Sequence, residues 1–182
     1  TLSSNLAWSG TFAISNVAIF AGAGTLSGTG AVTVTGSSLT LNNTGGLVTT
    51  GTLSLPDAPC TFAGSAGFTV GTLRTVSLTA SRIHTLTFGN TYTVTASVLN
   101  NGTSATIRQA LKSSSAGNKV VFTLQAGATS SLIFCDPTDI DSSAGTTVMS
   151  IGGTITTTNN WLNTYSGQPT GEVINAPIIR GV

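Results

Sequence analysis

Residues 31–35, Ala-Val-Thr-Val-Thr, show the pattern that decides the fold of this chain. Apolar and hydroxyl side chains alternate one by one, and residues 11–15 and 38–42 repeat this alternation. Because successive side chains of a β-strand point to opposite faces, the pattern places apolar groups on one face and hydroxyls on the other. The apolar spacing of a helix is nearly absent. We therefore expect an all-β protein.

The composition is that of a folded protein with very little charge. Charged residues make up 6% of the chain, and the first of them is Asp57. Thr contributes 34 residues and Ser 22, while the hydrophobic fraction reaches 40% and the net charge is +1. Disordered segments combine low hydrophobicity with high net charge, which is the opposite case. An ordered core beneath a hydroxyl coat is therefore expected.

Charge and cysteine spacing exclude several classes of partner. The small net charge gives no electrostatic reason to expect a nucleic acid or an anionic membrane. No apolar run approaches the roughly 20 residues that cross a bilayer, so no membrane segment is expected. The one basic stretch, Arg108, Lys112 and Lys119, is expected at a solvated strand edge. Cys60 and Cys135 lack CxxC spacing, and two buried free thiols are favoured over a disulfide or a zinc site.

The spacing of turns favours a β-solenoid. Glycine- and asparagine-containing turns recur at short intervals from Gly22 to Gly153, separated by short runs of Val, Ile, Leu, Phe and Thr. A sandwich or a barrel has similar turns, but its solvent faces would carry more charge. We expect a single elongated domain of about seven or eight turns with roughly 20–25 residues in each. The spacings fix no register. Residues 105–112 are the one candidate helix, and their β-branched residues also permit a strand.

The chain changes character after Trp161. Residues 163–182 lose the short alternating strands and contain prolines. We expect a β-helix domain over residues 1–162 and a C-terminal tail, residues 163–182, that serves as a cap or an attachment segment, because a solenoid needs its open ends covered. Trp8 and Trp161 are expected to close the two ends of the core.

The tail carries the expected contact with a partner. Exposed apolar clusters usually mark contacts with other chains. The tail has four such residues outside the repeat, Val173, Ile174, Ile178 and Ile179. We therefore expect the chain to associate with itself, for example as a homotrimer, or to attach to a larger particle.

The second half of the chain resembles a known class of β-helix. It opens on His-Thr-Leu-Thr-Phe-Gly at residues 84–89, continues through Ile-Phe-Cys-Asp-Pro-Thr-Asp-Ile-Asp-Ser-Ser-Ala-Gly at residues 133–145, and closes on Asn-Asn-Trp at residues 159–161. This plan, over about residues 83–163, resembles right-handed parallel β-helix modules of bacteriophage appendage proteins (spikes, fibres and head decorations) and of bacterial surface proteins. In such modules an Asp-Ile-Asp-Ser-Ser strand and a terminal Asn-Trp are common.

The resemblance implies a right-handed parallel β-helix with a stalk-like or platform-like role outside the cell. The chain is then expected to be a non-enzymatic structural protein, a head fibre, decoration or tail-appendage subunit of a phage virion. Its expected partners are itself, other virion or surface proteins and a host-surface glycan. Its expected location is the virion or an extracellular surface. No cofactor is expected.

The carboxylate cluster Asp136, Asp139 and Asp141 supports two chemical alternatives. Two acids on a β-helix face cleave glycosidic bonds in some enzymes, and Asp139 and Asp141 would lie about 7 Å apart on one face of a strand. A polysaccharide-cleaving enzyme that uses these two residues is therefore the first alternative. All three acids could instead hold calcium, although their spacing matches no EF-hand loop. The favoured interpretation is structural, with Asp136 ending a turn and the other two on an outer face.

Two further features have structural explanations that we favour. His84 is the only histidine and no GxSxG motif accompanies it, so a partly exposed strand histidine is expected rather than a hydrolase. Threonine pairs with one residue between them place two hydroxyls on one strand face, and stacked pairs would give an ice-binding array. The second alternative function is therefore a binding module, either a bacterial adhesin or an ice-binding β-solenoid. These pairs are Thr33/Thr35, Thr85/Thr87, Thr91/Thr93/Thr95 and Thr156/Thr158.

Overall fold

The structure, a computed structural model, describes residues 4–15, 19–35, 39–56, 59–76 and 78–164. These residues form two β-sheets, one of 12 strands and one of 6, and contain no helix. The larger sheet consists of β1 (Leu6–Trp8), β2 (Phe12–Ser15), β4 (Leu26–Gly28), β5 (Val32–Thr35), β7 (Leu47–Pro56), β9 (Phe68–Val76), β11 (Thr91–Asn101), β13 (Val120–Leu124), β14 (Thr129–Ile133), β16 (Ile140–Asp141), β17 (Val148–Ile151) and β18 (Trp161–Thr164). The smaller sheet consists of β3 (Ile19–Gly22), β6 (Leu39–Asn43), β8 (Cys60–Phe62), β10 (Arg82–Leu86), β12 (Gln109–Ser113) and β15 (Cys135–Thr138).

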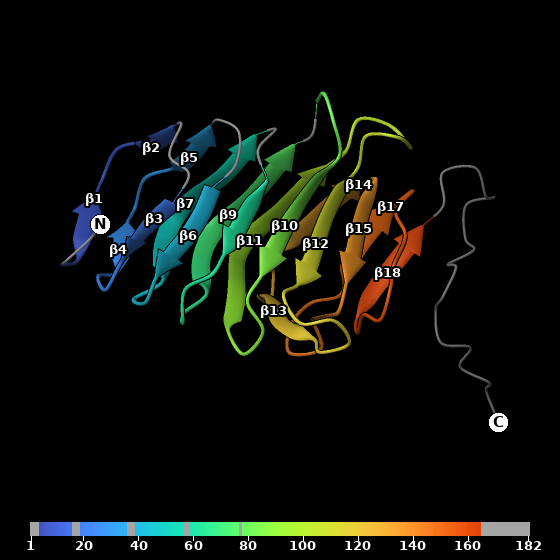
Figure 1. Cartoon of the computed structure of the whole chain (residues 1–182). Helices are drawn as coiled ribbons and strands as arrows, with labels where there is room; N and C mark the ends of the chain where they lie inside the picture. Colours follow the sequence, from blue (N-terminus) through green and yellow to red (C-terminus); the bar gives the residue numbers. More distant parts are fainter. Residues whose placement is uncertain (1–3, 16–18, 36–38, 57–58, 77, 165–182) are drawn as a thin grey trace.

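The strands wind into a parallel β-solenoid of about five turns, as the alternating pattern predicts. Figure 1 shows them stacked along one axis, from β1 at one end to β18 at the other. Leu6 pairs in parallel with Leu26, which pairs with Leu47, so the chain returns to the same place one coil later. Hydrogen bonds between the first coils accordingly join residues 20 or 21 apart.

The expected number of turns, about seven or eight, is too high. The coils lengthen as far as Asp136 and then shorten, because Asp139 and Thr157, which are in contact, lie only 18 residues apart. The bond from the Thr87 hydroxyl to the Phe62 carbonyl joins residues 25 apart, and Arg108 contacts Asp136 over 28 residues. The candidate helix at residues 105–112 is also wrong, because its C-terminal half belongs to β12. Residues 165–182 lie outside the described part of the chain.

Inward side chains form rows that run from coil to coil. In the larger sheet Leu26, Leu47 and Phe68 are register partners, and all three are buried. In the smaller sheet a row runs through Leu39, Cys60, His84 and Leu111, which are also buried. Each coil therefore buries its apolar face against the coils on either side, which gives a continuous core along the axis.

Tryptophans lie at both ends of this core, as expected. Trp161 on β18 is buried against Phe122, with ring centroids 6.3 Å apart, and its Nε1 donates to the Ser142 hydroxyl at 2.9 Å. Trp8 on β1 packs on Phe12 at 5.4 Å and donates to the Gly30 carbonyl oxygen at 3.3 Å. The indoles thus cover the first and last described coils with apolar surface.

Glycine is required where the backbones of neighbouring coils approach most closely. A Cβ on Gly30 would lie 1.7 Å from the Gly10 carbonyl oxygen, and one on Gly71 would lie 2.0 Å from the Thr50 carbonyl oxygen. No side chain fits at either place. These glycines let the coils stack at the normal spacing of parallel strands, about 4.8 Å.

Candidate functional site

The three acids of the candidate site lie on different elements. Asp136 is on β15, Asp139 lies at the corner after it, and Asp141 ends β16. The expectation that Asp139 and Asp141 share one face of a strand is wrong. The chain turns at Asp139, whose φ is 55°, and passes there from the smaller sheet to the larger one.

Asp136 forms an ion pair with Arg108. One carboxylate oxygen, Oδ2, accepts from Arg108 Nε at 2.8 Å, and the other accepts from the Thr154 backbone N–H at 2.7 Å. The side chains of Arg108 and Asp136 are 25% and 28% exposed, so solvent screens the pair only in part. Both oxygens of Asp136 are thus engaged by residues of neighbouring segments.

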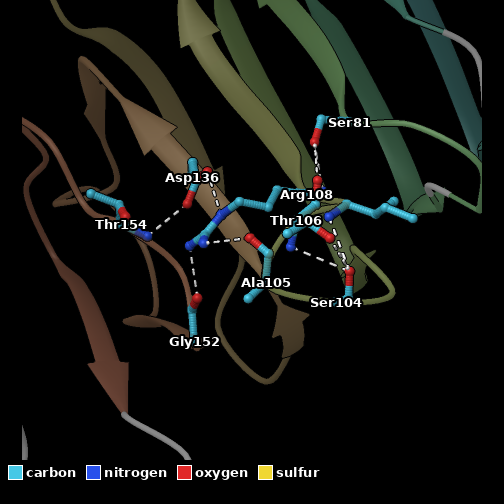
Figure 2. A network of polar contacts seen from close by, with 9 residues as sticks. Ser81, Ser104, Ala105, Thr106, Arg108, Asp136, Gly152 and Thr154 are labelled. Carbon is cyan, nitrogen blue, oxygen red and sulfur yellow. Dashed lines mark hydrogen bonds and ion pairs between the residues drawn. The ribbon is translucent and has the colours of Figure 1, made fainter.

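Arg108 is the centre of a wider network that Figure 2 shows. Its Nη2 donates to the Gly152 carbonyl oxygen at 2.8 Å and its Nη1 to the Ala105 carbonyl oxygen at 3.2 Å. Its backbone N–H donates to the Ser81 hydroxyl at 2.9 Å. Ser81, Arg108 and Asp136 belong to three successive coils, so one residue ties all three together. The expectation that Arg108 sits at a merely solvated strand edge is wrong.

Asp139 is buried, at 5% exposure, and both of its carboxylate oxygens accept hydrogen bonds. Its Oδ1 accepts from the Thr157 hydroxyl, and its Oδ2 accepts from the Gly117 backbone N–H at 2.9 Å. The Thr157 hydroxyl and then the Gly117 N–H lower the pKa of Asp139 from its ordinary value, because they stabilise the ionised form. Gly117 lies one coil before Asp139 and Thr157 one coil after it.

Asp141 is bound by the turn that follows it. Its Oδ1 accepts from the Ser143 hydroxyl at 2.6 Å and from the Ser143 backbone N–H at 2.9 Å. These two bonds, the hydroxyl first, lower the pKa of Asp141. This arrangement is an Asx turn, in which an aspartate fixes the backbone two residues further on.

The chemistry of the three acids is therefore that of hydrogen-bond acceptors. Cleavage of a glycosidic bond needs one carboxylic acid whose pKa is raised, so that it can give a proton to the leaving group. The pKa values of Asp139 and Asp141 are both shifted the other way. Among the described residues, no three His, Cys, Asp or Glu side chains come together in a group that could hold a metal ion.

His84 is fully buried, which corrects the expectation of a partly exposed histidine. Its Nε2 donates to Oε1 of Gln109 at 2.7 Å, since a carbonyl oxygen can only accept. Burial lowers the pKa of His84 to about 4, against the opposing effect of the Gln109 bond, and nearby Arg82 also lowers it. His84 is therefore neutral at physiological pH. Sequence reasoning missed this pair because Gln109 lies 25 residues away.

The two cysteines are buried free thiols, as predicted. Burial raises the pKa of Cys60 to about 12. The pKa of Cys135 is raised too, first by burial and then by nearby Asp136. Both thiols thus remain protonated and unreactive at neutral pH.

The threonine pairs do not stack into a two-column array. Thr33 has Ala13 and Ser54 as register partners, and Thr91 pairs with Val121. The longest aligned threonine rows found in the register run through Thr69, Thr93 and Thr123 on the larger sheet and through Thr40, Thr61 and Thr85 on the smaller sheet, where Lys112 follows. Ice binding stays a prediction without a matching two-column surface in the described coils.

The described part of the surface has a shallow groove and scattered apolar side chains. The groove, of about 210 Å³, is lined by glycines and by apolar and threonine residues, among them Gly67, Leu47 and Thr91, with no ionisable group. Ile133 and Ile151 are register partners on the outer face near β18 and are 37% and 41% exposed. The expected contact residues Val173, Ile174, Ile178 and Ile179 lie outside the described residues.

A scan against protein-family models, a search of curated proteins and a search of solved structures each find no match. In the described part of the chain, no helix has the length and apolarity to cross a membrane. The residues and their geometry therefore carry the functional argument.

Proposed function

We propose that the chain is a non-enzymatic structural module, a rigid β-solenoid that forms part of a phage virion, as a head fibre, decoration or tail-appendage subunit, or of a comparable extracellular surface. The stacked coils support this role, because each coil is held by its neighbours through backbone hydrogen bonds between parallel strands and a continuous apolar core. The phage assignment rests on the resemblance of the second half of the chain to such modules.

The observation that carries the structural role is how the acids are used. Asp136 and Asp139 each accept hydrogen bonds on both carboxylate oxygens from residues 18 to 28 positions away. Such bonds join neighbouring coils, and those to Asp139 favour its ionised form. A catalytic pair would instead leave oxygens free for substrate and would keep one acid protonated.

The test of this assignment is the double variant Asp139→Asn with Asp141→Asn. We expect the wild-type chain to cleave no polysaccharide from a panel of bacterial surface glycans, measured as newly formed reducing ends, and the variant to behave identically. The matched control is Ser143→Ala, which removes a donor to Asp141 and leaves both acids in place. Cleavage by the wild type that disappears in a variant with an unchanged circular dichroism spectrum would instead establish the polysaccharide-cleaving enzyme.

Assembly with itself or with other virion proteins is the second part of the proposal. Residues 1–56 carry no charge, and surfaces buried between subunits are depleted in charge. Exposed Ile133 and Ile151 near β18 add apolar surface at the end from which the tail continues. Deletion of residues 165–182 leaves β18 intact and is expected to lower the association state measured by analytical ultracentrifugation, with a homotrimer as the expected wild-type form.

A substitution variant separates the tail's apolar residues from its length. Replacement of Val173, Ile174, Ile178 and Ile179 by Ser should reproduce the effect of the deletion. A full-length chain that stays monomeric at high concentration and is absent from particles imaged in its native source contradicts the proposed role.

A further inference from the structure

The core contains a layer of polar side chains that the proposed function does not use. Thr75, His84, Asn100 and Gln109 are all 0% exposed, although their side chains are polar. Thr75 and His84 lie on β9 and β10, and Asn100 and Gln109 on β11 and β12. The four residues therefore belong to two successive coils, one residue from each sheet in each coil.

The register places this layer between apolar neighbours. Thr75 and Asn100 are partners in the larger sheet, and the same row continues to Leu55 on one side and Leu132 on the other. In the smaller sheet the row of His84 continues to Cys60 and the row of Gln109 to Cys135, both buried. Leu55, Leu132 and the two thiols thus bound the layer along the axis, and its other neighbours in the smaller sheet are Leu111 beside His84 and Arg82 beside Gln109.

The two halves of the layer lie near the same corner of the coil. Thr75 is one residue from the end of β9, and Asn100 is one residue from the end of β11. In the strands that follow, His84 is the middle residue of β10 and Gln109 is the first residue of β12. Thr75 and His84 thus flank the connection from the larger to the smaller sheet in one coil, Asn100 and Gln109 flank it in the next, and all four side chains are fully buried.

The hydrogen bonds of this layer are incomplete. The bond from His84 Nε2 to Gln109 Oε1, at 2.7 Å, joins two of the four residues. Six buried side-chain atoms have no partner among the described residues. Five of them belong to this layer, namely Thr75 Oγ1, His84 Nδ1, Asn100 Oδ1, Asn100 Nδ2 and Gln109 Nε2, and the sixth is Oδ1 of the adjacent Asn101. Buried polar atoms of folded proteins nearly always have a partner, and internal water is the usual one where protein groups do not suffice.

Donors and acceptors are mixed in the way that water requires. His84 Nδ1 and Asn100 Oδ1 accept hydrogen bonds, the amide nitrogens of Asn100 and Gln109 donate them, and the Thr75 hydroxyl does both. A buried water molecule typically makes about three hydrogen bonds and needs both kinds of partner. An ion fits less well, because none of the four side chains is charged; the one charged register partner is Arg82, beside Gln109.

We propose that Thr75, His84, Asn100 and Gln109 form an internal binding site for ordered water, enclosed in the core between the two sheets. Water donates to His84 Nδ1 and Asn100 Oδ1 and accepts from the amide nitrogens of Asn100 and Gln109. The four side chains are fully buried, and Leu55, Leu132 and the two thiols bound the site along the axis.

The test measures long-lived water in the full chain by oxygen-17 relaxation dispersion. We expect a dispersion from the wild type, a clear loss of amplitude in the double variant Thr75→Val with Asn100→Leu, and no change in Thr69→Val, which makes the same substitution on the exposed face of β9. A wild type without dispersion overturns the proposal, and so does a folded double variant with unchanged amplitude.

A high-resolution crystal structure of the wild type decides the matter even if the double variant fails to fold. Water density within hydrogen-bond distance of both Asn100 and His84 supports the site. A direct bond from the Asn100 amide to His84 Nδ1, with no water between the two sheets at this level, overturns it.

Discussion

Protonation of His84 should destabilise the fold in a defined pH window. The unfolded chain takes up a proton near pH 6.5, whereas the folded chain keeps His84 neutral down to about pH 4 because the ring is buried. The stabilisation is therefore complete above pH 6.5 and is lost as the pH falls from 6.5 to about 4. At about 1.4 kcal/mol for each pH unit, the loss amounts to about 3 kcal/mol.

This window isolates His84 from other groups. His84 is the only histidine of the chain. The pKa values of Asp139 and Asp141 are lowered, so their contributions are present above the unfolded value of about 3.9 and are lost at still lower pH. Urea unfolding followed by circular dichroism at several pH values between 7 and 4.5 should show the free energy of unfolding fall by most of the expected 3 kcal/mol, or about 2–3 kcal/mol.

The control removes both partners of the buried bond. His84→Leu with Gln109→Leu replaces the hydrogen-bonded pair by apolar groups and avoids leaving a lone polar partner, which makes such a change nearly neutral. The double variant should keep the same free energy of unfolding from pH 7 to 4.5. An equal slope in wild type and variant, or a wild type insensitive to pH in this range, refutes the burial argument.

Two further changes test the contacts between coils. Gly30→Ala should destabilise the chain by about 3 kcal/mol or prevent folding, because its Cβ would overlap the Gly10 carbonyl oxygen. The control Gly10→Ala has open space around its Cβ and should shift the melting temperature little. Equal shifts in the two variants contradict the stacking of these two glycines. Arg108→Ala should lower the free energy of unfolding in urea by about 1–2 kcal/mol, because the bonds to Asp136 and Gly152 are lost. The control Arg74→Ala changes an exposed side chain and should lower it by less than about 0.5 kcal/mol. An Arg108→Ala variant as stable as the wild type shows that the network is solvated in solution.

The fold was predictable because alternation acts locally. A short run such as residues 31–35 predicts by itself which side chains face inward. The structure confirms this, because Val32 and Val34 are buried while Thr33 and Thr35 are not. The register was not predicted, although one signal was present. The glycines at positions 10, 30, 51 and 71 recur at nearly one coil length. They mark where neighbouring backbones approach most closely.

The candidate site was less predictable because distant residues determine it. Residues 139–141, Asp-Ile-Asp, alternate like a strand, yet Asp139 takes a left-handed conformation that its bonds to Gly117 and Thr157 support. Asp tolerates this conformation better than most residues. His84 was ambiguous for another reason. Ile83 and Leu86 fall on opposite faces of β10, so the sequence does not show which face is buried. In the structure Leu86 and His84 are buried, and Ile83 is 47% exposed.

The position of Asp139 determines how the rod comes apart. Coils of a solenoid contact only their neighbours, so a rod can peel from an end one coil at a time. Separation of the coil of Gly117 or that of Thr157 from the coil of Asp139 removes one of the two hydrogen bonds to this carboxylate, which raises the free energy of opening at these coils. The coils of residues 1–56 have no acid to join them in this way. Amide hydrogens should therefore exchange first near β1 and last, as one cooperative unit, in the coils that meet at Asp139.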